Sequence, residues 1–150
     1  MTNETGRHWP DLAGRIEGRR HILPIRVYFE DTDFSGLVYH ATYLRWCERG
    51  RSDFLRLLGV KHADLHAGGD GGEPAAFVVR RLEIDYLRPA RIDEVLEVVT
   101  GTAETGGAHI TLAQRIERGG EVLCKVLVKV VLISQSGRPL RLPPAVRGVM

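Results

Sequence analysis

Two acids, Asp31 and Asp33, stand just before a long amphipathic segment, an arrangement that could act on a carbonyl group. The stretch Tyr28-Phe-Glu-Asp-Thr-Asp-Phe-Ser-Gly-Leu-Val-Tyr-His-Ala-Thr-Tyr43 passes from a strand pattern through these acids to a turn at Ser35-Gly36. The N-terminus of a helix carries unpaired backbone N–H groups and positive potential, so it can stabilise an oxyanion. A nearby carboxylate can act on the same carbonyl as base or nucleophile. The pairing suggests acyl chemistry.

The bulk composition predicts a single globular domain. The chain has 150 residues, of which 43% are hydrophobic and 27% charged, enough to bury a core. A formal net charge of +2 without a dense Lys/Arg block argues against nucleic acid as a partner. No apolar signal region and no run near the roughly 18 apolar residues of a membrane span are found. We expect a cytoplasmic protein without an integral membrane segment, in which Cys47 and Cys124 are buried, reduced thiols.

One long helix and five strands are expected from the hydrophobic pattern. The helix covers residues 38–58, where apolar side chains recur with helical spacing and Gly59 provides a stop. Gly50 in its interior predicts close packing or a bend. Residues 68–72 are expected to form a surface loop, since the GKS/T ending of a phosphate loop is missing. β-branched and apolar runs predict the strands, with Gly-Gly turns between the last three: 21–29, 76–87, 95–105, 108–118 and 121–133.

These elements predict an α+β fold. The last strand is apolar on both faces, so it should be central or lie at a subunit interface. A single helix is enclosed only if the sheet curls round it. We therefore expect a curved antiparallel sheet, its last four strands in meander-like succession, wrapped around one long central helix. The domain should cover residues 21–142, with a flexible arm at 1–20 and a loop-like tail at 143–150.

The chain resembles a known family over residues 21–142. The stretch Glu30-Asp-Thr-Asp-Phe-Ser-Gly-Leu-Val-Tyr-His-Ala-Thr-Tyr43, followed by Glu48-Arg-Gly-Arg51, is similar to the signature of hotdog-fold acyl-CoA thioesterases of the 4-hydroxybenzoyl-CoA thioesterase type. The similarity is greatest to the Tol-Pal-associated acyl-CoA thioesterases. Asp85-Tyr-Leu-Arg-Pro-Ala90 followed by Asp93-Glu94 resembles a second, weaker motif of the same family.

The resemblance implies a hotdog fold and coenzyme A thioester substrates with short-chain or aromatic acyl groups. It implies no metal and no cofactor. It also implies a homodimer or homotetramer whose active sites lie at subunit interfaces.

The same resemblance implies roles for individual residues. Asp33 matches the catalytic carboxylate, and His40 occupies the position whose backbone N–H faces the thioester carbonyl. Thr42, where many relatives have Asn or Arg, could alter substrate preference. Arg88 and Arg91 could hold coenzyme A phosphates, although scattered surface arginines are the simpler interpretation. The turn glycine, the residues that lead into the helix, its first aromatic residue and one arginine form the expected substrate-binding set: Gly36, Val38, Tyr39, Tyr43 and Arg88.

Each acid also has a simpler interpretation. Asp33 could be a turn or N-cap residue, a role that Asp31 is expected to have. A metal site at these acids lacks a third ligand nearby. A Ser35–His40–Asp33 triad does not suit the geometry of one short turn, and whether the His40 imidazole takes part stays open. Glu48 is a second-choice base, but an ion pair with a helix arginine, Arg45 or Arg51, is the simpler interpretation.

Two further groups have alternative roles. His62 and His66 have the i, i+4 spacing of a metal pair, although surface positions explain them without further ligands. Tyr43 and Trp46 could be core aromatics or walls of an acyl pocket.

The function expected from the sequence is thioester hydrolysis. Asp33 would be general base or nucleophile, and the helix N-terminus near His40 would be the oxyanion hole. The alternatives are a hotdog-fold hydratase or dehydratase acting on acyl-CoA and a non-catalytic acyl-CoA-binding module. Acyl chain length, the choice between the two chemical routes, and dimer versus tetramer stay open.

Overall fold

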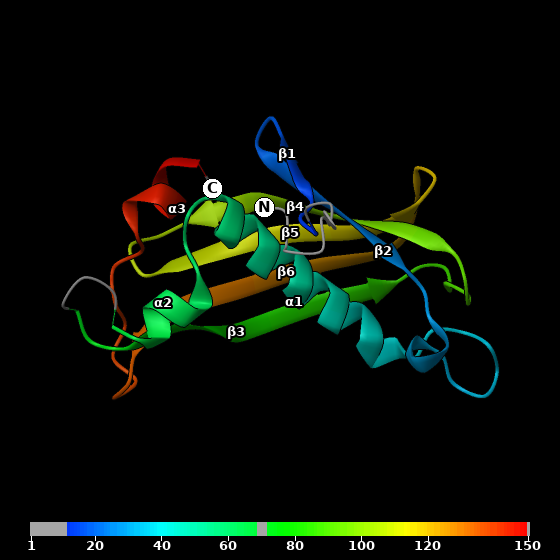
Figure 1. Ribbon diagram of the computed structural model, residues 1–150, viewed down its shortest axis with the longest axis horizontal. Helices are drawn as coiled ribbons and strands as arrows, with labels where there is room; N and C mark the ends of the chain where they lie inside the picture. Colours follow the sequence, from blue (N-terminus) through cyan, green and yellow to red (C-terminus); the bar gives the residue numbers. More distant parts are fainter. Residues whose placement is uncertain (1–11, 69–71, 150) are drawn as a thin grey trace, which may run out of the picture.

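One curved sheet wraps one long helix in the computed structural model, which describes residues 12–68 and 72–149 (Figure 1). The helical elements follow the chain: a 3-10 helix (Phe29–Asp31), α1 (His40–Leu57), α2 (His62–His66) and α3 (Pro144–Val149). The strands are all antiparallel to their neighbours: β1 (Arg15–Glu17), β2 (Arg20–Arg26), β3 (Ala75–Tyr86), β4 (Val95–Thr105), β5 (His109–Arg118) and β6 (Glu121–Ser134).

The strands lie in the order β1-β2-β4-β5-β6-β3, which corrects the expected succession. Only β4, β5 and β6 form a meander, because β3 pairs with β6 and β2 pairs with β4. The two-residue turn Gly119-Gly120 joins β5 to β6. Both glycines have positive φ, which is the backbone conformation of a tight hairpin turn. The link at residues 87–94 is longer than the β5–β6 turn. It lets the chain cross from the edge strand β3 to β4, which lies beside β2.

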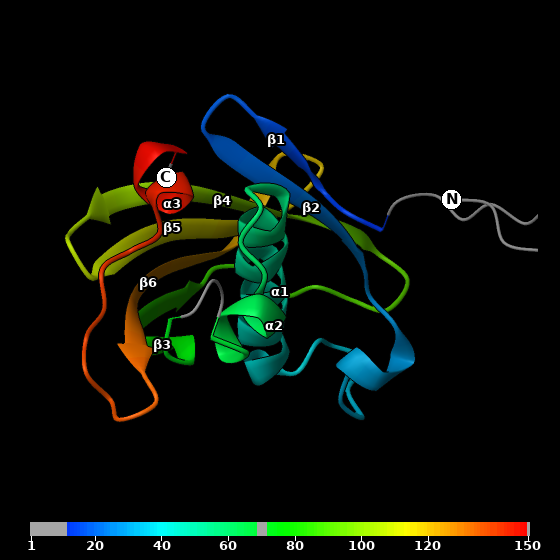
Figure 2. The same cartoon turned by 60° about the vertical axis from the view of Figure 1, so that its left-hand side comes forward.

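Helix α1 lies on the concave face of the sheet (Figure 2). Its apolar stripe is buried there, and its limits differ from the expected ones by one or two residues. Gly50 is the point of closest approach: a Cβ atom at this position would lie 2.9 Å from Val98 Cγ1 and 3.3 Å from Thr100 Oγ1. The predicted close packing at Gly50 is therefore confirmed. The core residues of the helix are Tyr43, Trp46, Cys47, Phe54 and Leu55.

The predicted inner position of the last strand is also confirmed. β6 lies between β5 and β3. Val128 on the helix-facing side is fully buried, whereas on the other side Val131 is 9% exposed and Leu127 is 43% exposed. The convex face of the sheet is therefore only partly covered in a single chain.

Both ends of the described chain are more ordered than the sequence predicted. Within the expected arm, residues 15–17 form β1, and Gly18 with φ 62° makes the turn into β2; residues 1–11 lie outside the described part. The loop-like tail is wrong for residues 144–149, which form α3. Val146 on α3 and Leu142 before it are buried against the core, and a proline is well suited to the first position of a helix.

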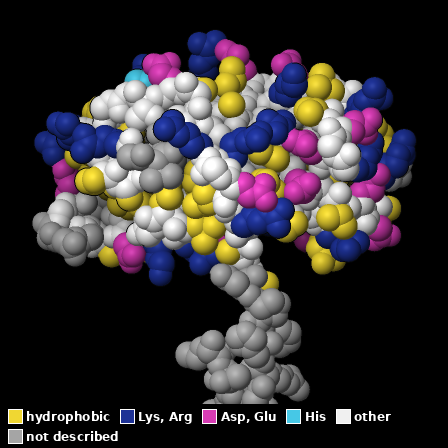
Figure 3. All heavy atoms as spheres, turned by 90° about the horizontal axis from the view of Figure 1, so that it is seen from above, with side chains coloured by type: hydrophobic (Ala, Val, Ile, Leu, Met, Phe, Trp, Pro, Cys, Tyr) yellow, Lys and Arg dark blue, Asp and Glu magenta, His cyan; other side chains and the backbone are white. Residues whose placement is uncertain are grey.

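The surface seen in Figure 3 mixes basic, acidic and hydrophobic side chains without a large area of one charge, in line with the small net charge. Within the described residues, no helix has the length and apolar character to cross a bilayer.

Candidate active site

The segment 31–39 forms a short turn that is fastened to the start of α1. Its backbone closes on itself, because the Asp33 N–H donates to Leu37 O at 3.0 Å and the Gly36 N–H donates to Asp33 O at 3.1 Å. Gly36 has φ 81°, a conformation that favours glycine. The Tyr39 N–H donates to Asp31 O at 3.0 Å. The turn that carries Asp33 is thus bonded directly to the residue that precedes the helix.

The Asp33 carboxylate is exposed and oriented by one neighbour. Its Oδ1 accepts hydrogen bonds from the Ser35 hydroxyl and, at 2.8 Å, from the Ser35 N–H. These bonds, the one from the hydroxyl first, hold the pKa of Asp33 below its ordinary value. The carboxylate is therefore ionised at neutral pH. Among the described residues, nothing bonds to Oδ2, which is left to act on a substrate or on water.

The N-terminus of α1 is open. Tyr39 is the N-cap, its side chain makes no capping hydrogen bond, and the first turn contains no acidic residue. The first amides of a helix have no intrahelical acceptor, so those of His40 and Ala41 are available to an oxygen from outside. The His40 ring packs against Tyr39, with 4.4 Å between ring centroids. No hydrogen bond joins that ring to Ser35 or Asp33 in the described part of the chain, so the triad is not formed.

The segment after β3 fixes the first turn of α1 from the other side. Tyr86, the last residue of β3, donates its hydroxyl to His40 O at 2.7 Å. The Ala90 N–H donates to the Tyr43 hydroxyl oxygen at 2.9 Å, and the Val38 N–H donates to Ala90 O at 3.0 Å. Val38 and Tyr43 are buried, and burial raises the pKa of Tyr43. Val38 and Tyr43 therefore hold the start of α1 from within the core rather than lining an open surface.

The remaining predicted residues divide into two places. Arg88 lies after β3 near the same end of the helix, is 64% exposed at its side chain, and pairs with Glu121 through an Nε–Oε2 distance of 3.2 Å. Glu48 lies two turns along α1, where it lines a cavity. Asp33 is not among the residues that line this cavity. The structure thus brings Asp33, the turn and the helix start together, and it separates Glu48 from them within one chain.

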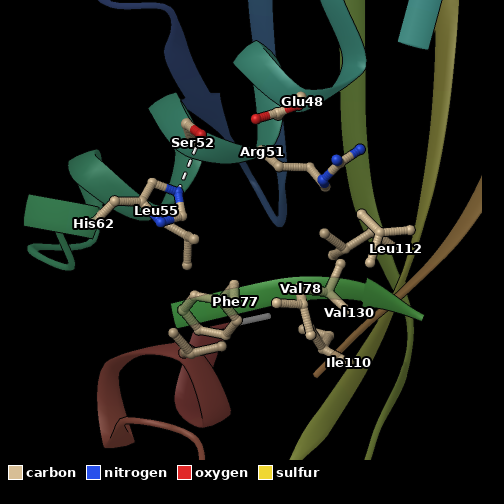
Figure 4. A pocket seen from close by; sticks show the side chains of 12 residues that line it. Glu48, Arg51, Ser52, Leu55, His62, Phe77, Val78, Ile110, Leu112 and Val130 are labelled. Carbon is tan, nitrogen blue, oxygen red and sulfur yellow. Dashed lines mark hydrogen bonds between the residues drawn. The ribbon is translucent and has the colours of Figure 1, made fainter. Parts of the chain in front are cut away.

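The cavity has a volume of about 320 Å³ and lies between the second half of α1 and the sheet (Figure 4). Its helix side is polar and carries Glu48, Arg51 and Ser52, while its sheet side is apolar. The expected ion pair of Glu48 with Arg45 or Arg51 is wrong, since no such pair occurs in the described chain. His62 also lines the cavity, and its Nε2 lies 3.1 Å from the Ser52 hydroxyl. The apolar lining consists of Leu55, Phe77, Val78, Val79, Ile110, Leu112, Val130 and Val146.

Two expectations about other side chains can be compared with this geometry. Tyr43 and Trp46 are packed edge to face in the core, with centroids 5.5 Å apart, and neither lines the cavity. No group of three potential metal ligands occurs among residues 12–68 and 72–149.

Sequence reasoning missed three side chains near these sites. Tyr86 and the buried pair Arg51–Gln114 contact residues far away in the sequence. One pattern in the sequence could have identified Arg51. It lies on the same helical stripe as Cys47 and Leu55, one turn from each, so the stripe predicts a buried charged residue at this position.

Three comparisons relate the chain to known proteins. Residues 35–125 match the sequence profile of the thioesterase superfamily. The chain is 40% identical over 126 residues to the acyl-CoA thioesterase YbgC of Haemophilus influenzae, covering 83% of this chain and 90% of that protein. It is 38% identical over 122 residues to the acyl-CoA thioester hydrolase YbgC of Escherichia coli O157:H7, covering 81% and 84%. A crystal structure of a probable thioesterase from Bartonella henselae superposes with a TM-score of 0.79 at 45% identity, over 83% of this chain and 99% of that one.

The predictions of the fold and of the family are therefore confirmed. A profile match over more than half of the chain, relatives of about the same length, and a curved antiparallel sheet around one helix all agree. The chain belongs to the thioesterase superfamily, as a thioester hydrolase with the hotdog fold.

Proposed function

We propose that this protein hydrolyses the thioester bond of acyl-CoA, with Asp33 as general base or nucleophile and the first turn of α1 as the oxyanion hole. One observation carries the assignment: an exposed, ionised carboxylate is bonded through its turn to the open N-terminus of the long helix. The names of the two YbgC relatives supply the substrate class, coenzyme A thioesters.

The chemistry follows from these two parts. The thioester oxygen accepts hydrogen bonds from the amides of His40 and Ala41, which stabilise the negative charge that develops on it. In one route Asp33 removes a proton from water, and the resulting hydroxide adds to the carbonyl carbon. In the other, Asp33 attacks that carbon and forms a mixed anhydride that water then hydrolyses. In both routes the coenzyme A thiolate leaves and takes up a proton. Arg88, whose side chain is 64% exposed beside its ion-pair partner Glu121, would contact the phosphates of coenzyme A.

A second copy of the chain would complete the site. β3 is an edge strand whose outer side has no partner among the described residues, and Val78 and Val79 on it are 38% and 49% exposed. Tyr86 at one end of β3 contacts His40, whereas Phe77 and Val79 near the other end line the cavity. Antiparallel pairing of two β3 strands about a two-fold axis would bring the Asp33 turn of one copy to the cavity of the other. The acyl group would then occupy that cavity, in a homodimer or in a tetramer built from two such dimers.

The replacement Asp33→Asn tests the function, because it keeps the shape of the side chain and removes its basicity. We expect thiol release from a panel of short-chain and aromatic acyl-CoA thioesters to fall by about 10²–10⁴-fold. Asp64→Asn, at an exposed position on α2, is the matched control and should leave turnover unchanged. Full turnover by Asp33→Asn would overturn the assignment. Hydration of enoyl-CoA without thiol release would favour a hydratase, and tight coenzyme A binding without any turnover a binding module.

A further inference from the structure

A buried cation without a counter-ion lines the apolar cavity. Arg51 projects from α1 and is only 9% exposed. Its Nη1 donates to Gln114 Oε1 at 3.0 Å, and in the described chain the guanidinium makes no other hydrogen bond and no ion pair. The remaining N–H donors of the guanidinium have no protein acceptor; they are not among the fully buried, unbonded polar atoms of the described chain and are accessible from the cavity.

Gln114 explains why the fold offers Arg51 only a neutral partner. Its Nε2 donates to Cys47 O and to Thr100 Oγ1, both at 2.9 Å, so the orientation of the amide is fixed. The amide oxygen must then face Arg51. An amide oxygen accepts a hydrogen bond but does not balance a positive charge, so this contact leaves the charge of Arg51 without a neutralising partner.

The acidic groups around Arg51 do not change this conclusion. Glu48 is the one carboxylate in the cavity lining, but it is exposed and too far from the guanidinium for an ion pair. In Figure 4 its carboxylate and the guanidinium point in different directions. The neighbouring Cys47 thiol is neutral, because burial raises its pKa to about 12. Burial lowers the pKa of Arg51, and the nearby charge of Glu48 acts in the opposite direction without outweighing it.

The rest of the cavity suits a short carbon chain. Its volume of about 320 Å³ is at the lower end of the range of roughly 300–1,000 Å³ for small-molecule sites. Figure 4 shows Leu112, Val130 and Ile110 on the sheet side, opposite the helix that carries Arg51. A ligand with an apolar middle and an anionic end would contact the apolar wall and satisfy the guanidinium together.

We propose that Arg51 binds a carboxylate at the distal end of the acyl group, so that the preferred substrates are coenzyme A monothioesters of short dicarboxylic acids. This inference rests on the proposed thioesterase function and on entry of the acyl group into this cavity. A guanidinium matches a carboxylate with two parallel N–H···O bonds. An acyl group ending in a methyl would leave the cation buried and unpaired, whereas a terminal carboxylate neutralises it.

The first experiment compares matched substrates with the wild-type protein. Succinyl-, glutaryl- and adipyl-CoA are each paired with the isostere in which an isopropyl group replaces the carboxylate: 4-methylpentanoyl-, 5-methylhexanoyl- and 6-methylheptanoyl-CoA. Thiol release is measured after subtraction of spontaneous hydrolysis. We expect a preference in kcat/KM of about ten-fold or more for the dicarboxylic member of at least one pair, because a charge-assisted bidentate contact distinguishes the two ends.

The second experiment assigns the preference to Arg51. Arg51→Met should remove it and leave hydrolysis of the branched isosteres in place. Arg51→Lys, which retains the charge but loses the bidentate geometry, should keep only part of it. Arg45→Met changes an exposed arginine of the same helix and should behave like the wild type. Since Arg51→Met also leaves Gln114 Oε1 without a donor, folding of each variant is checked by circular dichroism, and the wild-type ratios decide the question if either variant fails to fold.

The outcomes separate this inference from the proposed function. Hydrolysis of the branched isosteres with equal or slower hydrolysis of every dicarboxylic thioester would overturn the role of Arg51 and leave the thioesterase intact. An unchanged preference in folded Arg51→Met would do the same. Absence of thiol release from these substrates and from the wider short-chain and aromatic panel would overturn both.

Discussion

The hydroxyl of Tyr86 donates a 2.7 Å hydrogen bond to the carbonyl oxygen of His40, which ties the last residue of β3 to the first residue of α1. The edge strand and the electropositive end of the helix are therefore one unit. Because β3 is also the edge available to a second copy, the same bond connects the proposed subunit contact with the proposed oxyanion hole.

Tyr86→Phe should lower turnover without unfolding the protein. The change removes one neutral hydrogen bond at the first helical turn, so we expect kcat to fall about two- to ten-fold. Tyr28→Phe, at another exposed tyrosine, should keep wild-type turnover. The measurement is thiol release at saturating substrate, and equal kcat for both variants would contradict a positioning role for Tyr86.

The acid limb of the pH–rate profile should report the Asp33–Ser35 contact. The Ser35 hydroxyl lowers the pKa of Asp33, so activity is present above that pKa and is lost as the pH falls through it. In Ser35→Ala the pKa should rise toward the ordinary value of 3.8, which moves the acid limb to higher pH. The profile of kcat/KM against pH checks this, and a limb that stays in place would show that another group controls it.

Asp53→Asn should reduce stability at neutral pH. Asp53 accepts hydrogen bonds from the Gly14 N–H at 2.8 Å and from His21 Nε2 at 2.7 Å, and pairs with Arg56 at 3.2 Å. Burial raises the pKa of Asp53, but these contacts together outweigh it and the pKa lies below 3.8. The ionised form thus stabilises the fold above pH 3.8, and this stabilisation is lost as the pH falls through the folded-state pKa. We expect a loss of about 1–3 kcal/mol in urea unfolding at pH 7.

The same titration supplies the control for Asp53. The gap in unfolding free energy between wild type and Asp53→Asn should narrow as the pH is lowered below 3.8, because the wild-type carboxylate then becomes protonated. A gap that is independent of pH would mean that the charge of Asp53 does not stabilise the β1–β2 hairpin against α1.

Gly50→Ala should destabilise the protein although alanine is the better helix former. The gain in helix propensity is about 1 kcal/mol, whereas overpacking against Val98 Cγ1 at 2.9 Å costs about 1–3 kcal/mol. We expect a net loss of up to about 2 kcal/mol in urea unfolding. Val98→Ala provides the space, so in that background the same change should cost less or stabilise. If the effects of the two changes on the free energy of unfolding were additive, the contact with Val98 would not be the cause of the destabilisation.

Val79→Glu should weaken self-association; because Val79 also lines the cavity, the shared site is supported only if activity falls in proportion to the monomer fraction. A charge on the exposed edge of β3 opposes pairing of two such edges. Val95→Glu places the same charge at a residue of similar exposure, 51%, on β4 and should be without effect. Analytical ultracentrifugation and thiol release are measured on the same samples. A wild-type protein that is active as a monomer would contradict the shared site.

The limits of the elements could be predicted because they depend on local chemistry. The run predicted at 95–105 coincides with β4, and the Gly119-Gly120 turn, in which both residues have positive φ, sets the hairpin of β5 and β6. Strand partners could not be predicted in the same way. The link at 87–94 permits either a hairpin or a crossover, and β3 pairs with β6, which begins 35 residues after the end of β3, so no local signal contains this pairing.

In the candidate site, too, the local features could be predicted from the sequence, and the contacts between distant residues could not. Asp33, Gly36 and the helix start lie within one short stretch, so their proximity follows from the sequence. The contacts of Tyr86 with His40 and of Arg51 with Gln114 join residues 46 and 63 positions apart, and no local pattern contains them. Glu48 was placed correctly on the helix, but the distance between its cavity and Asp33 depends on how the helix crosses the sheet.

The turn at residues 33–37 is held entirely through its backbone and through Ser35, while Phe34 at its tip is fully exposed and contacts nothing that orients Asp33. A fluorescent label introduced at Phe34→Cys would therefore lie next to the carboxylate and, in the proposed dimer, close to the cavity of the second copy. Such a reporter would signal the binding of a thioester in real time, even where thiol release is too slow for a product assay.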